Sequence, residues 1–388
     1  MKTVQCLFIG LFLSTISTLS AQEADSTKTT PVQITFAYPI ASNGPESKNI
    51  SNNISFNILY GVNGGVSGFE LGSLVNVING NVEGCQIAGI TNVVDGPVMG
   101  VQFGGIANVI TDSLFGLQIA GIANIVPKST TGGQFAGIHN LTNGPFIGAQ
   151  FSGISNVVNG TVIGAQLAGI HNLATDSVTG VQVSGIYNQS LKTIRGAQIG
   201  LVNSSHVLHG FQLGLINVAD SSTGVSIGLI NIVKNGYHAV EFSSNEVMLA
   251  NVTLKSGTDQ FYNIYTVGFQ PNTTQTFGFG FGFGSKFKLA KRMSISADLT
   301  VSHINELDNF DWKMNLLNRA DLTLDFHVNK NIALLIGPSF NAHVSELGYE
   351  NTGGFTTDIA VNPFYTESHN GYQLQMWVGA KGGVRISF

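Results

Sequence analysis

The chain has 388 residues, of which 48 are glycine and only 10% are charged, with a formal net charge of -5. An ordinary soluble domain has about 7% glycine and about 25% charged residues. The near-neutral balance leaves no basic patch for nucleic acid, and 43% hydrophobic residues is too many for a disordered chain. Outside the N-terminus no apolar run reaches the ~18 residues of a membrane-spanning helix. Composition therefore favours a glycine-rich β protein.

The first residues have the pattern of a secretory signal peptide. Lys2 precedes an apolar stretch over residues 6–13, and small or hydroxylated residues follow as far as Ala21. We expect cleavage after Ala21, followed by a polar linker over residues 22–31. Cys6 leaves with the signal and Cys85 remains alone, so the sequence predicts an exported chain without a disulfide.

A sixteen-residue repeat fills the middle of the chain, over residues 63–236. Each unit reads Gly-x-Gln-apolar-small-Gly-Ile-x-Asn followed by two apolar residues and a turn, and Glu70 stands in the first Gln slot. After Gln198 the unit contracts to fourteen residues, and about eleven copies end near Gly236. The recurring amides are Gln86, Gln102, Gln118, Gln134, Gln150, Gln166, Gln182 and Gln198, with Asn92, Asn108, Asn124, Asn140, Asn156, Asn172 and Asn188.

Two architectures are compatible with this repeat. In a parallel β-solenoid or β-roll, coils stack at about 4.8 Å, so like residues form ladders whose amides bond one another. In the alternative the repeats are themselves strands of one large barrel, but identical single-strand units do not face each other in an antiparallel sheet. The apolar positions follow neither a period of two nor one of 3.6. We therefore predict a solenoid of about eleven coils.

The recurring Gln and Asn side chains are interpreted as structural ladders. Stacked amides satisfy one another's donors and acceptors, so their recurrence requires no ligand. His139 and His171 share the position before Asn, which Ala, Thr, Ser and Tyr also fill. No metal site is therefore expected there.

Segments on both sides of the repeat alternate with a period of two. From Tyr372 to Phe388 the apolar residues fall on one face, and Lys381 and Arg385 fall on the other. Strands of this length with one polar face are typical of a transmembrane β-barrel with a wet lumen. We predict an antiparallel barrel of about ten strands, the first from residues 32–62 and the others from 237–388.

Two stretches of the chain resemble known bacterial sequences. The tail VGAKGGVRISF resembles the C-terminal recognition signal of outer-membrane barrel proteins, which implies that Phe388 serves as the membrane-insertion signal. The implied partners are outer-membrane lipid and the barrel-assembly machinery. The stretch GLINVADSSTGVSIGLIN resembles Bacteroidetes-like outer-membrane surface-repeat proteins built from Gly-x-Gln-x-Gly-Leu-Ile-Asn units. Both resemblances imply a location in the cell outer membrane.

Loop lengths predict the orientation of the barrel. With a periplasmic C-terminus, the long segments 270–276, 304–316 and 345–371 fall outside, and the short turns fall inside. If residues 238–243 form a separate strand, the repeats lie on the periplasmic side or in the lumen. If 238–256 is a single strand, they face the exterior.

No motif in the sequence predicts catalysis, a metal site or a cofactor. A predicted outer loop gathers titratable side chains that we interpret as solvated: His303, Glu306, Asp308 and Asp311, with Trp312. His206 and His209 flank a repeat turn and are expected to be exposed.

The lumenal charges are expected to pair inside the barrel: Arg319, Asp321, Asp325, Lys381 and Arg385. The sequence thus predicts a non-enzymatic outer-membrane protein with a structural or adhesive role. The alternative is a porin-like channel or transport component whose lumen is extended or plugged by the repeats.

Overall fold

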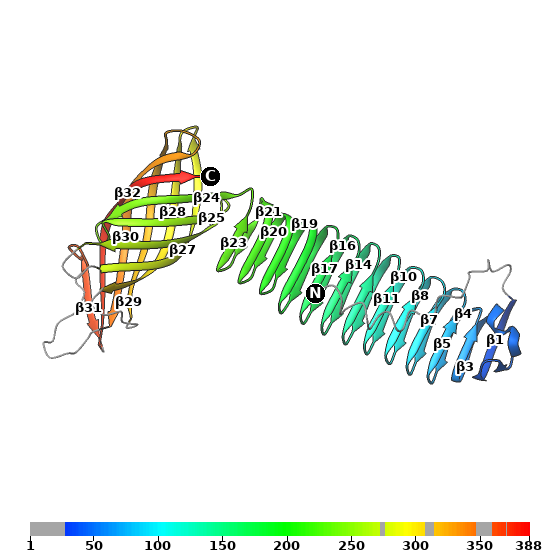
Figure 1. Ribbon diagram of the computed structural model, residues 1–388. Coiled ribbons are helices and arrows are strands. Elements are labelled where there is room, and N and C mark those ends of the chain that lie inside the picture. Colours follow the sequence, from blue (N-terminus) through cyan, green and yellow to red (C-terminus); the bar gives the residue numbers. More distant parts are fainter. Residues whose placement is uncertain (1–27, 272–275, 307–313, 347–358, 370) are drawn as a thin grey trace. The chain divides into compact units, whose positions relative to one another are not determined.

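The structure is a computed structural model, which describes residues 28–271, 276–306, 314–346, 359–369 and 371–388 (Figure 1). Within these residues the chain is all-β apart from one short 3-10 helix, η1 (Gly44–Asn49). One sheet is a parallel β-solenoid of about eleven coils and the other closes into an antiparallel barrel, which confirms the predicted fold class. No helix in this part of the chain is long and apolar enough to cross a membrane.

The chain folds as two compact units, Met1–Ala136 and Gly137–Phe388. The first contains the early coils, with strands β1 (Lys28–Ala37), β2 (Ile40–Ala41), β3 (Ile50–Asn63), β4 (Gly65–Gly72), β5 (Val75–Ile78), β6 (Val82–Ala88), β7 (Thr91–Val94), β8 (Val98–Gly104), β9 (Ala107–Ile110), β10 (Leu114–Ala120), β11 (Ala123–Val126) and β12 (Thr130–Ala136). The later coils belong to the second unit and contain β13 (His139–Thr142), β14 (Phe146–Ser152), β15 (Ser155–Val158), β16 (Val162–Ala168), β17 (His171–Ala174), β18 (Val178–Ser184), β19 (Tyr187–Ile199), β20 (Val202–Leu213), β21 (Ile216–Ser222), β22 (Val225–Ile227) and β23 (Ile230–Val233).

A regular coil consists of a seven-residue strand, a Gly-Ile corner, a four-residue strand and a turn. Strand β6 pairs in parallel with β8 so that Gln86 lies opposite Gln102, and β7 pairs with β9 so that Asn92 lies opposite Asn108. Parallel, in-register pairing of like residues excludes the alternative in which the repeats are barrel strands. Between the stacked long strands and the stacked short strands lie apolar clusters, which in the first unit include Val82, Val98 and Leu114.

The glycine two residues before each Gln is fixed by backbone geometry. Gly164 has a φ of +133°, a conformation that side chains rarely adopt, and a Cβ placed there would lie 1.9 Å from the carbonyl oxygen of Gly148. Gly180 is crowded in the same way by Gly164. This close approach of successive backbones accounts for one of the two glycine columns.

The shorter coils keep both amide columns in register. Gln198 still lies opposite Gln212, and Asn203 lies opposite Asn217. One residue is lost at the corner, where β19 ends at Ile199, and the second is absorbed by a register shift between Ser190 and Thr193. The contraction therefore falls outside the positions that stack in the interior.

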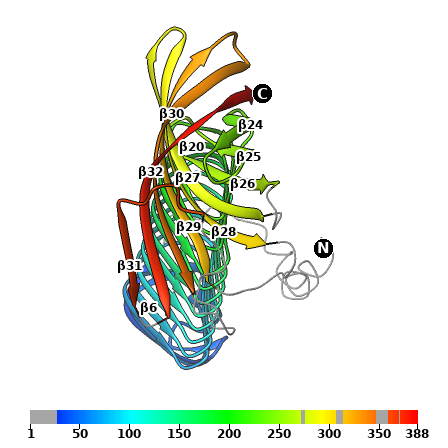
Figure 2. The ribbon, with the colours of Figure 1, turned by 90° about the vertical axis from the view of Figure 1, so that its left-hand side faces the viewer.

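The barrel has eight strands rather than the predicted ten. Strands β24 to β30 follow one another in chain order, and β32 pairs with both β30 and β24 to close the wall. Short β31 pairs with the start of β32. The strands are β24 (Tyr237–Asn245), β25 (Ala250–Gly257), β26 (Tyr262–Gln270), β27 (Thr276–Ala290), β28 (Met293–Glu306), β29 (Asn315–His327), β30 (Ile332–Glu346), β31 (Tyr365–His369) and β32 (Tyr372–Ser387). Figures 1 and 2 both show β27, β28 and β29 side by side.

The difference in strand number comes from residues 32–62. These residues lie in β1 and β3, which pair in parallel with each other, and β3 continues into the solenoid by pairing with β4 and β5. A two-residue alternation describes any strand with one buried face, whether its neighbours are parallel or antiparallel. The alternation of 32–62 therefore did not distinguish a first coil from a barrel strand.

The faces of the barrel strands are inverted relative to a water-soluble barrel. On β29 the buried side chains are Leu317 near the start and then Arg319, Asp321, Thr323 and Asp325, while Leu322 is half exposed. Strand β32 repeats this arrangement, with buried Lys381 and Arg385 and outward Val378 and Ile386. The polar face thus points into the lumen and the apolar face points outward.

The glycine geometry predicts the effect of a single methyl group. We expect Gly164→Ala to lower the free energy of unfolding by more than about 2 kcal/mol, because it combines a disfavoured φ with a backbone clash. The matched control is Ala165→Val, since Val181 fills the same slot one coil later. Thermal denaturation followed by circular dichroism measures both. Equal stability of the two variants would contradict the proposed crowding.

Candidate functional site

The Gln side chains form a directional ladder in the interior of each unit. Gln102 Nε2 donates to Gln86 Oε1 at 2.6 Å, and in the second unit Gln182 Nε2 donates to Gln166 Oε1 at 2.8 Å. Every Gln of the column, including Gln118, Gln134, Gln150 and Gln198, is fully buried. Each amide donates toward the N-terminus and accepts from the C-terminal side, so that burial leaves these groups paired.

The Asn side chains form a second ladder with the opposite direction. Asn92 Nδ2 donates to Asn108 Oδ1 at 2.8 Å and also to the carbonyl oxygen of Phe103 at 2.8 Å. Asn156 Nδ2 makes the corresponding bonds to Asn172 Oδ1 and to the carbonyl oxygen of Leu167. The second bond reaches the end of the long strand one coil later, so this ladder also links the short strands to the long strands. The same column contains Asn124, Asn140 and Asn188, all fully buried.

The ends of the ladders are closed by side chains that break the repeat. Glu70 Oε2 accepts from Gln86, and its Oε1 accepts from Asn57 at 2.9 Å and from Asn63 at 2.5 Å. A carboxylate only accepts hydrogen bonds, so it suits a position on which three amide donors converge. At the other end, Asn231 of the last coil donates to Asn263 on β26 of the barrel.

Full burial of Glu70 raises its pKa to about 7, although its hydrogen bonds to Gln86, Asn57 and Asn63 oppose that rise. Desolvation of the charge is the larger effect because the carboxyl has no exposed surface. The Glu70 carboxyl is thus a fully buried group of the solenoid interior that titrates near neutral pH.

This pKa predicts that the stability of the solenoid depends on pH. In the unfolded chain a glutamate has a pKa of about 4.3, so between about pH 4.3 and 7 the folded chain holds a proton that the unfolded chain has released. Stability is therefore full below this window and falls as the pH rises through it, by roughly 4 kcal/mol in total. We expect Glu70→Gln to abolish the dependence and Glu83→Gln, at an exposed position, to retain it. Urea titrations at pH 5 and pH 8 measure the difference, and a wild type that is equally stable at both contradicts it.

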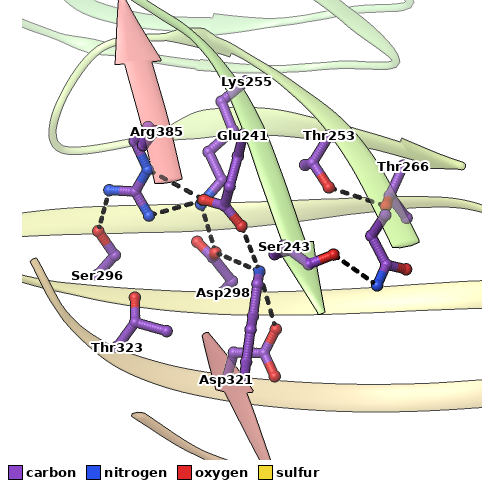
Figure 3. Close-up of polar contacts among 12 residues, drawn as sticks. Glu241, Ser243, Thr253, Lys255, Thr266, Ser296, Asp298, Asp321, Thr323 and Arg385 are labelled. Carbon is purple, nitrogen blue, oxygen red and sulfur yellow. Dashed lines mark hydrogen bonds and ion pairs between the residues drawn. The ribbon is translucent and has the colours of Figure 1, made fainter. Parts of the chain in front are cut away.

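Eight buried charges in the barrel lumen form a balanced network, and Figure 3 shows the part of it around Glu241. Lys255 Nζ lies 3.1 Å from Glu241 and 2.5 Å from Asp298, and Lys381 Nζ lies 2.6 Å from Glu241. Arg385 bridges Glu241 at 2.9 Å and Asp325 at 2.6 Å. The members are four acids and four bases, each at most 8% exposed: Glu241, Asp298, Asp321 and Asp325, with Lys255, Arg319, Lys381 and Arg385.

Apolar layers close the lumen on both sides of this network. On one side Tyr237 and Tyr262 pack with ring centroids 5.0 Å apart, and Tyr262 donates to Asp298 at 2.7 Å. On the other, the β24–β25 turn places Val247 and Met248 in a buried cluster with Trp377. Between them lies a cavity of about 40 Å³, which holds a few water molecules at most. The lumen is therefore packed, as expected for a barrel of eight strands.

The turn that closes the lumen is held by the partly buried carboxylate of Glu246, which is 15% exposed. Glu246 accepts hydrogen bonds from Trp377 Nε1 at 3.1 Å, from Asn341 Nδ2 at 2.8 Å and from the Ala380 amide at 3.0 Å. These donors come from β30 and β32, so they fix the turn inside the wall rather than outside it. Neither of the two arrangements predicted for residues 238–256 places this turn inside the lumen.

The other singled-out side chains are scattered. His139 and His171 lie on the short strands of the coils, where burial lowers the pKa of each imidazole. His206 Nδ1 lies 2.5 Å from Asp220, and His209 Nδ1 lies 2.7 Å from Thr223, both in exposed pairs.

Only part of the predicted outer loop can be placed. Asp308, Asp311 and Trp312 lie outside the described residues, while the ring of His303 stacks on Phe279 with centroids 5.7 Å apart. Glu306 ends β28. Phe388 follows β32, is exposed, and stacks on His238. No group of three His, Cys, Asp or Glu in the described part of the chain is arranged to hold a metal ion.

Comparison with known proteins identifies no relative: no family model, no curated protein and no solved structure matches the chain.

Several members of the lumenal network were not singled out from the sequence. Glu241, Lys255 and Asp298 lie on the polar faces of predicted strands, so their burial in the lumen follows from the alternation. Which of these charges pair does not follow from the alternation, because Glu241 and Arg385 are 144 residues apart in the chain. The sequence signal that predicts such a network is the presence of both acidic and basic residues at inward positions of the strands.

The network predicts a large effect of removing one buried cation. We expect Lys255→Met to destabilise the barrel by about 3–5 kcal/mol, because Glu241 and Asp298 lose a shared partner while staying buried. The matched control is Lys128→Met, whose ammonium pairs with Asp112 at an exposed turn and is expected to contribute little. The temperature at which the barrel loses its folded electrophoretic mobility measures both. A Lys255→Met barrel as heat-stable as the control would contradict the role of the network.

Proposed function

We propose that the protein is a non-enzymatic outer-membrane protein in which the eight-stranded barrel anchors the solenoid, with a structural role in the cell envelope. The observation that carries this proposal is the inverted barrel. A closed wall with charges inside and apolar side chains outside is stable where the exterior meets lipid rather than water. The outward residues that support it include Phe242, Val252, Leu254, Val267, Leu299, Leu322, Ile336, Phe340 and Val378.

The rim of the barrel supports a membrane location in a second way. Exposed Lys288, Lys291, Arg292 and Lys330 lie at the end where β27 turns into β28 and β29 turns into β30. Next to them on the outer surface lie Phe287 and other large apolar side chains. Long cations bury their stems along apolar surface and extend their charge to the headgroups, so this arrangement suits the edge of a bilayer.

The chain connectivity favours a periplasmic solenoid. Residues 238–243 belong to a separate strand, β24, whose start pairs antiparallel with the end of β32, as Ala239 opposite Ser387. The solenoid therefore enters the barrel at the end where the chain finishes. A periplasmic C-terminus would then place the solenoid in the periplasm, which favours a structural role over adhesion at the cell surface.

The packed lumen favours an anchor over a channel. Buried ion pairs and two apolar layers fill the barrel, and the remaining cavity of about 40 Å³ is too small for a solute path. A porin-like role would require the β24–β25 turn to leave the lumen, which would uncover Val247 and Met248 and break the bonds to Glu246.

The orientation is tested by a protease site inserted between Asn159 and Gly160, in an inter-coil turn. We expect this site to survive protease treatment of intact cells and to be cut once the outer membrane is permeabilised. The same site inserted after Asn362, an exposed residue just before β31, is expected to be cut in intact cells, because β31 pairs with the start of β32 and the solenoid enters beside its end. Cleavage of the solenoid site in intact cells would contradict the periplasmic placement and restore the adhesive role.

The anchor proposal also predicts the electrical behaviour of the purified protein. After refolding into planar lipid bilayers, the wild type is expected to give no stepwise current, because the ion network and its flanking layers block the lumen. A porin reconstituted in parallel serves as the positive control. Reproducible conductance steps from the wild type would reject the anchor in favour of a channel.

A further inference from the structure

The coils expose an apolar face that has no partner within the chain. It consists of the outward side chains of the long strands and the Ile or Leu at the corner that follows each of them. In the second unit it includes Phe151, Ile154, Ile163, Ile170, Ile186 and Leu201, which are between 37% and 53% exposed. The first unit has the same columns, with Phe103, Ile106 and Ile122 among their members. Monomeric proteins rarely leave so many large apolar side chains contiguous and exposed.

Charge is placed away from this face. In the second unit the ion pairs Lys192–Asp176 and Lys234–Asp220 lie on the turns between coils. The column after each Gln and the corner column contain no charged residue from Leu71 to Leu229. The exceptions on the long strands, Glu83, Arg195 and His209, stand at the strand start, far from the corner. Each coil is therefore amphipathic, with a polar turn edge and an apolar corner edge.

The exposed area is sufficient for a stable protein interface. Thirteen large apolar side chains of the second unit lie on this face and are at least 36% exposed. At roughly 80 Å² for half of a large side chain, they present on the order of 1,000 Å². A standard interface buries about 800 Å² per partner, so this unit alone exceeds what a specific dimer requires.

We propose that this face binds the same face of a second copy of the chain. Its columns repeat once per coil, at the spacing of parallel strands, about 4.8 Å. A partner without that repeat loses register after a few coils, whereas an identical column keeps its ridges and hollows matched along the whole face. A pair formed by one surface with itself is an isologous dimer, the commonest form of homo-oligomer.

The direction of the two copies rests on the proposed function. If both barrels lie in one membrane, the two solenoids leave it on the same side and their axes are parallel. The dyad then runs along the solenoids, so each residue of the corner column faces its own counterpart. In an antiparallel pair, only a residue near the dyad would face itself.

Disulfide trapping tests the contact and its direction. In a chain lacking Cys6 and Cys85, a cysteine is placed at the corner as Ile154→Cys, Ile170→Cys or Ile186→Cys, and the control is Lys192→Cys on the polar edge. The full-length protein is reconstituted in liposomes of phosphatidylcholine and phosphatidylglycerol, oxidised mildly and analysed without reductant. We expect covalent dimer at all three corner positions, at least tenfold more than at the control.

A charge variant tests whether the apolar face holds the dimer. Ile154→Lys, Ile170→Lys and Ile186→Lys are combined, and the matched variant places lysines at Asn143, Asn159 and Thr175 on the turn edge. We expect the first to be monomeric with unchanged circular dichroism, since the replaced side chains are exposed, and the second to remain a dimer. A corner variant that dimerises like the wild type overturns the proposal.

The trapping outcomes separate this proposal from the one it rests on. Covalent dimer at a single corner position supports the shared face, but it contradicts parallel solenoids anchored in one membrane. Absence of dimer at all three positions overturns the proposal. Quenching of a dye on the Ile170→Cys corner by brominated lipid, without dimer, would identify lipid as the occupant instead.

Discussion

An amide buried in a stack of coils must find both a donor and an acceptor one coil away, and the solenoid is built around this requirement. It forces the same residue into the same slot of every coil, because a Gln such as Gln166 is satisfied only between two others. It also forces close approach of the backbones, which leaves room only for hydrogen at Gly164 and its equivalents. The sixteen-residue period of the sequence follows from these two requirements, because each coil must place its Gln and its Gly in the same slots. Where the period shortens, residues are lost at a corner and at a register shift, and both ladders continue.

A repeated ladder needs different chemistry at its ends. In the first repeat of the regular pattern Glu70 replaces Gln, because three amide donors converge there. At the last coil the side-chain oxygen of Asn263, on the barrel, accepts a hydrogen bond from Asn231. The Asn263 amide nitrogen donates to the carbonyl oxygens of Gly228 and Leu229. The Gln ladder thus ends at a residue that accepts from it without extending it, although β3 and β1 continue the stack of strands beyond Glu70.

In the barrel, the buried charged side chains are satisfied by ion pairs rather than by amide ladders. Its lumen contains full charges of both signs, and each acid lies beside a base from a distant strand, as Glu241 lies beside Lys381 and Arg385. With polarity inside, the apolar side chains point outward, and a lipid environment follows as the proposal. The solenoid combines an amide interior with an apolar outer face on its long strands. Both parts thus leave apolar surface for a partner, and the two partners proposed for them differ.

The sequence by itself determined the repeat, the ladder residues, the all-β class and the polar face of each barrel strand, because periods of sixteen and two are local properties of the chain. It could not decide that residues 32–62 begin the solenoid, since their alternation suits a parallel or an antiparallel neighbour equally. Nor could it pair Lys255 with Glu241 and Asp298, or fold the turn at Val247 into the lumen. Those outcomes depend on which strands meet when the wall closes, and closure is a tertiary event that brings together residues as much as 144 positions apart.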